Sequence, residues 1–300
     1  MKRVAFILAV FAALTVVVAS ADAAGIGPSQ APNIKVKNGY SSNWAGYAVP
    51  ASHGQVSDVV GKWTVPTLAC SQSVSTSGTN VRAGVASNGK AGGHKPGGSS
   101  GSTITGYSST WVGIDGDNSN TVEQIGTEQD CVTSANGEVQ SNYAWYEMYP
   151  KYPVNLDANK YPVKANDVMT AEVAYTGKGY FQLTLSDYGS NNTLKWKYSA
   201  QPQYAPSAKR SSAEWIVEAP WSGGVLPLAD FSPVTFSGSQ ANFGNGLKAI
   251  DSLPTYNSSD DAIIMVDSSG SPIAVPSGLN DSTNSVNGTS SSEFTVTRQP

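Results

Sequence analysis

The sequence has few of the side chains that most hydrolases use for catalysis. Its 300 residues include two histidines and two cysteines. His53 and His94 lie in turn-like segments rich in Gly, Ser or Pro, and neither accompanies a nucleophile elbow between a strand and a helix. A serine triad requires a histidine base that a carboxylate holds in place. The sequence therefore argues against a serine-triad enzyme.

Metal and nucleotide motifs are also missing. There is no H-E-x-x-H, no P-loop and no Rossmann fingerprint, and Cys70 and Cys131 are too far apart in sequence for a zinc ribbon. The run 115–118 brings several side-chain oxygens together, and calcium binding and ordinary turn chemistry both explain it. We expect no cofactor and no metal, with the calcium loop as an open alternative.

Charge is scarce throughout the chain. Asp, Glu, Lys and Arg make up 13% of the residues, and the formal net charge is -4. This composition has no basic footprint for nucleic acid. It also limits the positive repulsion that accumulates when carboxylates are protonated, which suits a protein that works in acid.

The N-terminus is typical of export. Lys2 and Arg3 precede an apolar run over residues 4–18, and small residues follow up to Ala23. This pattern predicts a signal peptide over residues 1–23, because the run is short for a transmembrane anchor. We expect a secreted product with no membrane partner. In an oxidising compartment, one disulfide between Cys70 and Cys131 is the default expectation.

The rest of the chain predicts one all-β domain. Residues 24–39 have no hydrophobic period and are expected to be a short pro-region or disordered tail. Residues 40–300 are expected to form a two-sheet antiparallel sandwich of the jelly-roll type. No heptad or long apolar face predicts assembly, so we expect a monomer. Surface loops are expected over 71–108 and 277–292. The expected strands, which alternate apolar and polar residues, are 44–49, 56–65, 109–114, 139–149, 168–176, 179–187, 195–198, 214–218, 234–237, 262–266 and 293–297.

Two of these strands combine acids with aromatic residues. In the first, period two places Trp145, Glu147 and Tyr149 on one face. In the second, Glu214 and Glu218 share a face, while the residues between them alternate toward the opposite layer. A solvated outer face explains two glutamates on one strand as well as an active site does.

The order of several short blocks resembles the glutamic peptidases, or eqolisins, of the peptidase A4/G1 family. The blocks are Ser42-Asn43-Trp44-Ala45-Gly46, Trp63-Thr64-Val65-Pro66, Trp111 to Gly116, Gln124-Ile125-Gly126, Ala144 to Pro150, Ala213 to Pro220, Leu228-Ala229-Asp230-Phe231 and Val234-Thr235-Phe236. They cover most of the chain between residues 40 and 266. The long 71–108 insertion and the short pro-region depart from the fungal pattern.

The resemblance implies a secreted acid endopeptidase that cuts polypeptides in a concave cleft. Its catalytic dyad falls on Glu218, as the general base that activates water, and Gln124, as the donor to the oxyanion. Further residues fall where the family lines or supports the cleft. They are Trp44, Trp111, Asp115, Trp145, Glu147 and Tyr149, with Glu214 as the neighbouring acid on the dyad strand.

Two other functions fit parts of the sequence. A carbohydrate-binding or glycoside-hydrolysing sandwich would use Glu147 and Glu218 as its carboxylate pair beside aromatic sugar platforms. That interpretation leaves the block around Gln124 without a role. A non-catalytic adhesion protein is supported only by the abundance of Ser, Thr, Gly and Asn.

Overall fold

The computed structural model describes residues 28–70, 103–134, 137–282 and 290–300. The expected signal peptide and residues 71–102 of the expected long loop lie outside this part. The described residues form an all-β fold whose one short helical turn spans Ile250–Ser252. Within them, no helix is long and apolar enough to cross a bilayer. The all-β expectation is confirmed.

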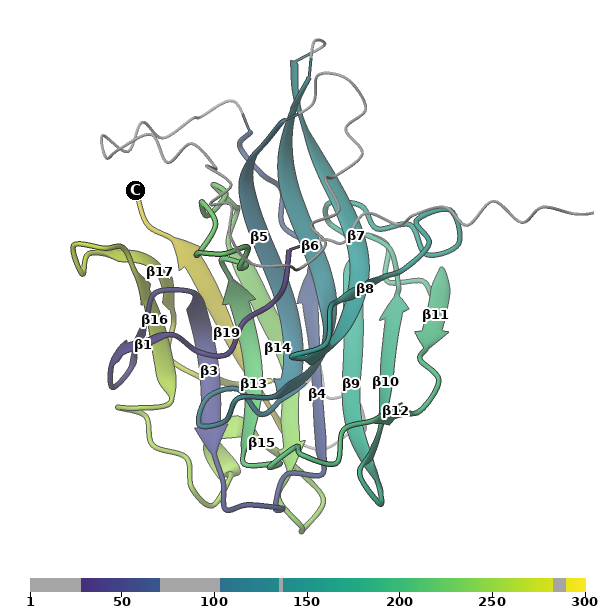
Figure 1. The fold of residues 1–300 in the computed structure, drawn as a ribbon, viewed down its shortest axis with the longest axis vertical. Helices are drawn as coiled ribbons and strands as arrows, with labels where there is room; N and C mark the ends of the chain where they lie inside the picture. Colours follow the sequence, from purple (N-terminus) through teal and green to yellow (C-terminus); the bar gives the residue numbers. More distant parts are fainter. Residues whose placement is uncertain (1–27, 71–102, 135–136, 283–289) are drawn as a thin grey trace, which may run out of the picture.

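One sheet, here called sheet I, carries most of the blocks that suggested a function. Its neighbouring strands pair antiparallel in the order β3, β13, β5, β6, β7, β8. In Figure 1 the long strands β5, β6 and β7 curve together across the front of the molecule and project beyond the others. Their bounds are β3 Trp44–Pro50, β13 Ser212–Glu218, β5 Thr103–Ile114, β6 Val122–Ser134, β7 Gly137–Tyr149 and β8 Val154–Asn155.

The second sheet, sheet II, has the antiparallel order β10, β9, β4, β14, β19, β17. Strand β16 (Ala262–Val266) pairs with β17 and also with β3, so it joins the two sheets along one edge. The bounds are β10 Tyr180–Asp187, β9 Val168–Gly177, β4 Asp58–Thr64, β14 Val234–Asn242, β19 Ser291–Arg298 and β17 Pro272–Pro276, with short strands β1 Lys35–Lys37, β2 Tyr40–Ser41, β11 Trp196–Ser199, β12 Gln203–Tyr204, β15 Leu247–Ala249 and β18 Asn280–Ser282.

The main hydrophobic core contains residues from the facing sides of both sheets. On β9, every second residue from Met169 to Val173 is buried, as the alternating sequence predicts. On β13, Trp215 and Val217 point into the same core. The indole of Trp215 donates from Nε1 to the carbonyl of Val60 at 2.7 Å, which ties β13 of sheet I to β4 of sheet II. The opposite face of sheet I is left for other contacts.

The short strands β1, β2, β8, β12, β15 and β17 were not expected, and three further segments also differ from the sequence-based expectation. Strand β6 was not expected, because its glutamates, glutamines and aspartate are residues that strands usually lack. Strand β5 begins at Thr103, so the last six residues of the expected 71–108 loop are sheet, and they pair with the end of β6. The expected 277–292 loop contains β18, which pairs with the start of β19. In each case pairing with a neighbouring strand outweighs a loop-like composition.

The expected disulfide between Cys70 and Cys131 is confirmed, with a Cα–Cα distance of 5.2 Å. It ties the chain after β4 to β6, across a sequence separation of 61 residues. A bridge that closes a loop of this length stabilises the fold by about 4 kcal/mol in the chain-entropy model.

We therefore expect the double variant Cys70→Ser, Cys131→Ser to lose about 4 kcal/mol of unfolding free energy. Urea unfolding of the variant and of the oxidised wild type measures the difference. Reduction of the wild type should give the same loss. An unchanged midpoint in both experiments would show that the bridge contributes nothing to stability.

Candidate active site

The outer face of sheet I, which points away from the main core, is lined by tryptophans and carboxyls. The side chains of Trp44, Trp111 and Trp145 are fully buried there and form a second hydrophobic cluster. Tyr149 packs against this cluster, while Tyr146 and Met148 lie on the core side. The predicted parity of the β7 strand is therefore confirmed.

Trp111 occupies the middle of this face because two glycines leave room for it. A Cβ on Gly126 would lie 2.5 Å from the Cβ of Trp111, and a Cβ on Gly113 would lie 2.9 Å from its Cζ3. Real Cβ atoms do not approach so closely, so larger residues at either position would displace the indole. The ring in turn donates from Nε1 to Glu218 Oε2 at 2.9 Å.

Glu218 ends strand β13 and is fully buried. Its Oε1 accepts hydrogen bonds from the backbone N–H of Ala31 at 2.8 Å and from Asn43 Nδ2 at 3.3 Å. Together with Trp111, these donors fix both carboxyl oxygens. Asn43 belongs to a block that carried the family resemblance, but sequence reasoning assigned it no role.

Gln124 lies on β6 beside Glu147 of β7, as the register of the two strands requires. Its Nε2 donates to Glu147 Oε2 at 3.1 Å and to the backbone carbonyl of Gln30 at 3.1 Å. Glu147 Oε2 also accepts from the N–H of Gln30 at 2.9 Å. Glu147 therefore orients the amide of Gln124 so that its N–H groups face the chain above the sheet.

That chain is the protein's own N-terminal segment, residues 28–34. In Figure 1 its dark purple trace crosses in front of sheet I before it reaches β1. Gln30 and Ala31 are 1% and 6% exposed, so the middle of the segment is buried in the face. Sequence reasoning expected a pro-region or disordered tail here and placed the start of order near residue 40. The contacts of this segment with the face were not predicted, because polar groups rather than an apolar period hold it.

Glu214 lies on β13 and Asp115 directly follows β5, and both are outside these contacts. Glu214 is fully buried, and none of the hydrogen bonds among the described residues joins its carboxyl to residues 28–34. The Asp115 carboxylate accepts hydrogen bonds from the N–H groups of Arg210 and Ser211, so it holds the two residues that immediately precede β13. Turn chemistry thus explains Asp115. Among the described residues, no group of three or more His, Cys, Asp or Glu side chains is placed to hold a metal ion.

The two glutamates of β13 are buried, so the alternative of a solvated outer face is wrong. Burial is also the main cause of their titration behaviour, because it disfavours the charged form. It raises the pKa of Glu218 well above its usual range, and the nearby Glu147 raises it further. The hydrogen bonds from Ala31, Trp111 and Asn43 act in the opposite direction.

Burial also raises the pKa values of other carboxyls on the outer face. Burial raises the pKa of Glu147 to about 8, against the hydrogen bonds that it accepts from Gln30, Ser29 and Gln124. Burial also raises the pKa of Asp130 to about 7, and that of its neighbour Glu128 well above the usual range. Sequence reasoning gave Glu128 no role. In acid these carboxyls are neutral and add no repulsion to the face.

These shifts predict a fold that is most stable in acid. Carboxyls of an unfolded chain ionise near pH 4, whereas Asp130 and Glu147 keep their protons to about pH 7 and 8. Their stabilisation is fully present below about pH 4 and is lost as the pH rises through the folded-state values. Between these limits each group lowers the unfolding free energy by about 1.4 kcal/mol per pH unit. Thermal unfolding from pH 4 to pH 8 tests this, and a melting temperature that is constant or increases with pH would contradict it.

Comparison with known proteins agrees with the fold and with the family that the sequence blocks suggested. The family model described as the peptidase A4 family matches residues 42–287. Aspergillopepsin-2 from Aspergillus niger is 29% identical over 246 residues, which are 81% of this chain and 76% of that protein. Two crystal structures of scytalido-glutamic peptidase, solved with transition-state analogues, give TM-scores of 0.54 and 0.51 at 18% and 19% identity. In both cases 86% of this chain and 98% of the other are covered. The chain belongs to the peptidase A4 family and is a glutamic-type endopeptidase.

Proposed function

We propose that this endopeptidase is exported and cuts polypeptides in acid with Glu218 and Gln124 as its dyad. One observation carries the assignment. Gln124 donates to the carbonyl oxygen, and Glu218 accepts from the nitrogen, of the same peptide group, that between Gln30 and Ala31. Two side chains on different strands thus contact the oxygen that would become the oxyanion and the nitrogen that would become the leaving amine in peptide hydrolysis.

The proposed chemistry assigns one task to each side chain. Ionised Glu218 removes a proton from the attacking water and, once protonated, delivers a proton to the leaving amine. The neutral amide of Gln124 donates to the oxyanion that develops on the carbonyl, and it does so at any pH. Glu147 holds that amide in place, and Trp111 and Asn43 hold the carboxyl of Glu218.

Acid conditions fit these assignments. Residues 28–34 cover Glu218, whose pKa is raised by burial and lowered by the hydrogen bond from the N–H of Ala31. When a solvated cleft replaces them, the pKa moves back toward about 4.3, the ordinary value for glutamate. A substantial fraction of the base is then ionised at mildly acid pH, while the protonated carboxyls around it keep the face neutral.

Export is supported by the leader sequence and by the disulfide, because disulfides persist in oxidising compartments. The low content of charged residues favours no nucleic-acid partner. Polypeptides are therefore the proposed substrates.

Casein digestion at acid pH tests the function. We expect cleavage by the wild type that an aspartic-peptidase inhibitor does not reduce. Release of sugar from a polysaccharide without proteolysis would instead support a glycosidase that uses Glu147 and Glu218. A protein that binds but cleaves neither substrate would contradict both enzymatic assignments.

A further inference from the structure

Basic side chains are distributed unevenly along the chain. Residues 151–210 contain eight Lys or Arg and four Asp or Glu, whereas the rest of the chain contains ten and eighteen. Six exposed lysines of this stretch lie between the end of β7 and the start of β12, and we call them the basic edge. They are Lys151, Lys160, Lys164, Lys178, Lys195 and Lys197. This surface has the opposite sign to the net charge of the protein.

At one end of the basic edge, two contacts connect lysines that are distant in sequence. Lys151 Nζ donates to the carbonyl of Tyr204, the last residue of β12, at 3.1 Å. The N–H of Ala205 donates to the carbonyl of Gly179 at 2.9 Å, and this glycine directly follows Lys178 in the turn between β9 and β10. The end of β12 is therefore in contact with both segments.

Strand β11 and the residue before it carry the lysines at the other end. Trp196 Nε1 donates to the carbonyl of Pro162 at 2.8 Å, so the loop that contains Lys160 and Lys164 lies against this strand. Strands β11 and β12 both pair antiparallel with β10, the outermost long strand of sheet II. In Figure 1 both lie beside β10 at the right of the view. The basic edge therefore follows the edge of sheet II.

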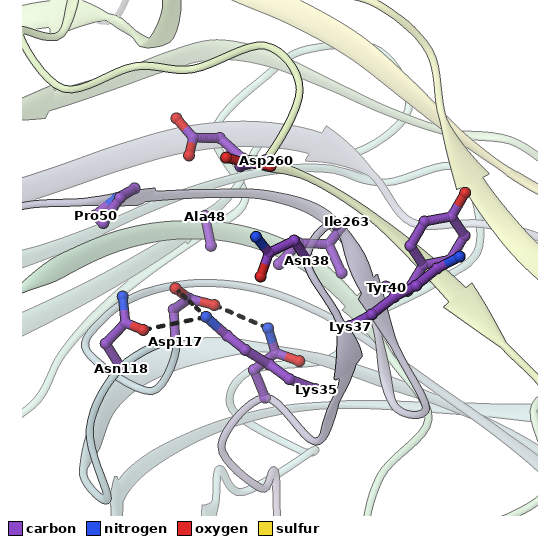
Figure 2. Close-up of a pocket in the computed structure, with 13 residues that line it drawn as sticks. Lys35, Lys37, Asn38, Tyr40, Ala48, Pro50, Asp117, Asn118, Asp260 and Ile263 are labelled. Carbon is purple, nitrogen blue, oxygen red and sulfur yellow. Dashed lines mark hydrogen bonds and ion pairs between the residues drawn. The ribbon is translucent and has the colours of Figure 1, made fainter.

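Most of these lysines form no salt bridge with the described residues. Within the basic edge only Lys160 does so, with Asp157 at 3.8 Å, and the side chain of this lysine is 74% exposed. Lys35, which lies outside the basic edge, differs. Figure 2 shows it held in a pocket by Asp117 at 2.9 Å and by Asn118 at 3.1 Å. The positive charge of the basic edge is therefore accessible to a partner.

Exposed tyrosine rings lie among these lysines. Tyr152, Tyr180 and Tyr204 are 72%, 42% and 50% exposed. The ring centroids of Tyr180 and Tyr204 are 4.9 Å apart, and Tyr152 directly follows Lys151. Tyrosine presents an apolar ring with a polar hydroxyl, which suits contact with the C–H faces and the hydroxyls of sugar rings. The basic edge thus combines groups that attract anions with groups that pack on sugars.

The spacing of the lysines favours a long partner over a small anion. Lys178 precedes β10, and the N–H of Lys195 donates to the carbonyl of Asp187, where β10 ends. The two lysines therefore lie at opposite ends of a strand of eight residues, which spans about 26 Å. A phosphate or sulfate ion could contact only one of them. An extended chain with repeated negative charges could contact several.

We propose that the basic edge binds an acidic polysaccharide, a polymer of sugars that carry carboxylate groups. The ammonium groups attract the carboxylates, and the tyrosine rings pack on the sugar faces. Lysine is a cation in acid, so the surface keeps its charge under the conditions proposed for catalysis. None of these residues belongs to the candidate active site. The polymer therefore holds the enzyme without occupying the cleft, whichever residues form the dyad.

Lysines on the edge of a sheet also oppose edge-to-edge pairing between molecules. That role explains Lys197, which lies within β11. It does not explain Lys151, Lys160 and Lys164, which lie in loops before β9. A surface that served only solubility would show no preference for a polymer of sugars over another polyanion.

Binding to immobilised polygalacturonate at about pH 5, where ordinary carboxyls are ionised, tests the inference. We expect the wild type to bind this polymer but not neutral dextran, and added salt to weaken binding because it screens the charges. The double variant Lys195→Gln, Lys197→Gln should bind about tenfold more weakly. The matched double variant Lys37→Gln, Lys248→Gln removes the same charge from exposed lysines elsewhere and should bind like the wild type.

A second polyanion distinguishes a glycan from an acidic polypeptide. Tyr152→Ala should weaken binding to polygalacturonate and leave binding to polyglutamate, which has no sugar rings, unchanged. Thermal unfolding and casein digestion by all these variants should match the wild type, because the replaced side chains are exposed and lie outside the candidate active site. Equal affinity of the wild type for the two polymers, or equal binding by the two double variants, would overturn the inference. A wild type that binds polygalacturonate but does not digest casein would contradict only the proposed function.

Discussion

Replacing Glu218 by glutamine is expected to lower kcat/KM for a polypeptide by about 10³- to 10⁴-fold at acid pH, the range that general acid–base catalysis supplies. Glutamine has nearly the same shape as glutamate, but its amide cannot take the proton of the attacking water. The loss should appear mainly in kcat, because the proposed base acts on the reacting atoms.

Folding must be measured beside activity, because Glu218 accepts hydrogen bonds from Trp111, Asn43 and Ala31. Near-ultraviolet circular dichroism and thermal unfolding at the assay pH show whether these tryptophan surroundings persist. A folded variant that retained a tenth or more of the wild-type turnover would exclude Glu218 as the base.

Gln124→Ala is expected to lower kcat by about 10²- to 10³-fold, the usual cost of removing one oxyanion donor. The reason is geometric, since its Nε2 lies 3.1 Å from the carbonyl oxygen of Gln30. Substrate affinity should change much less than turnover, because the oxyanion forms only during reaction. Steady-state kinetics on a peptide that releases a fluorophore on cleavage separate KM from kcat.

Gln129→Ala is the matched control for this variant. Gln129 is also buried on β6, but it lies five positions after Gln124, so its side chain points to the opposite face of the sheet. It should lose stability without a specific loss of kcat. Equal losses of kcat in the two variants would show that Gln124 has no specific role as the oxyanion donor.

Strand periodicity predicted much of the fold and part of the site. Alternation of apolar and polar residues predicted β9, β10 and β13, and it assigned Glu214 and Glu218 correctly to one face. The order of the sequence blocks predicted the family and the remaining candidate site residues, since the blocks around Trp111 and Glu147 resemble those of the A4 family. These features could be predicted because each depends on residues close together in sequence.

Contacts between distant residues could not be predicted in this way. Strand β6 has a polar sequence because its outward side chains, including Gln124 and Glu128, are buried against the segment that covers the face. Residues 28–34 have no hydrophobic period of their own. The polar sequence of β6 and the ordered conformation of residues 28–34 explain each other, because each segment supplies hydrogen-bond partners to the other.

The choice between the two acids of β13 also needs the three-dimensional structure. The register places Glu214, Gly113 and Gln124 in one row across the sheet, which would favour Glu214 as the partner of the glutamine. The indole of Trp111 lies over Gly113, the residue between Glu214 and Gln124 in this row, and donates to Glu218. Packing around one tryptophan therefore decides which carboxyl reaches the peptide.

A side-by-side measurement of Glu218→Gln and Glu214→Gln tests this account most directly. The two variants make the same chemical change on the same face of the same strand. We predict that Glu218→Gln abolishes acid cleavage of casein, whereas Glu214→Gln retains activity within about tenfold of the wild type, because its carboxyl has no part in proton transfer. Loss of activity in Glu214→Gln together with turnover by Glu218→Gln would contradict the assignment of the catalytic base.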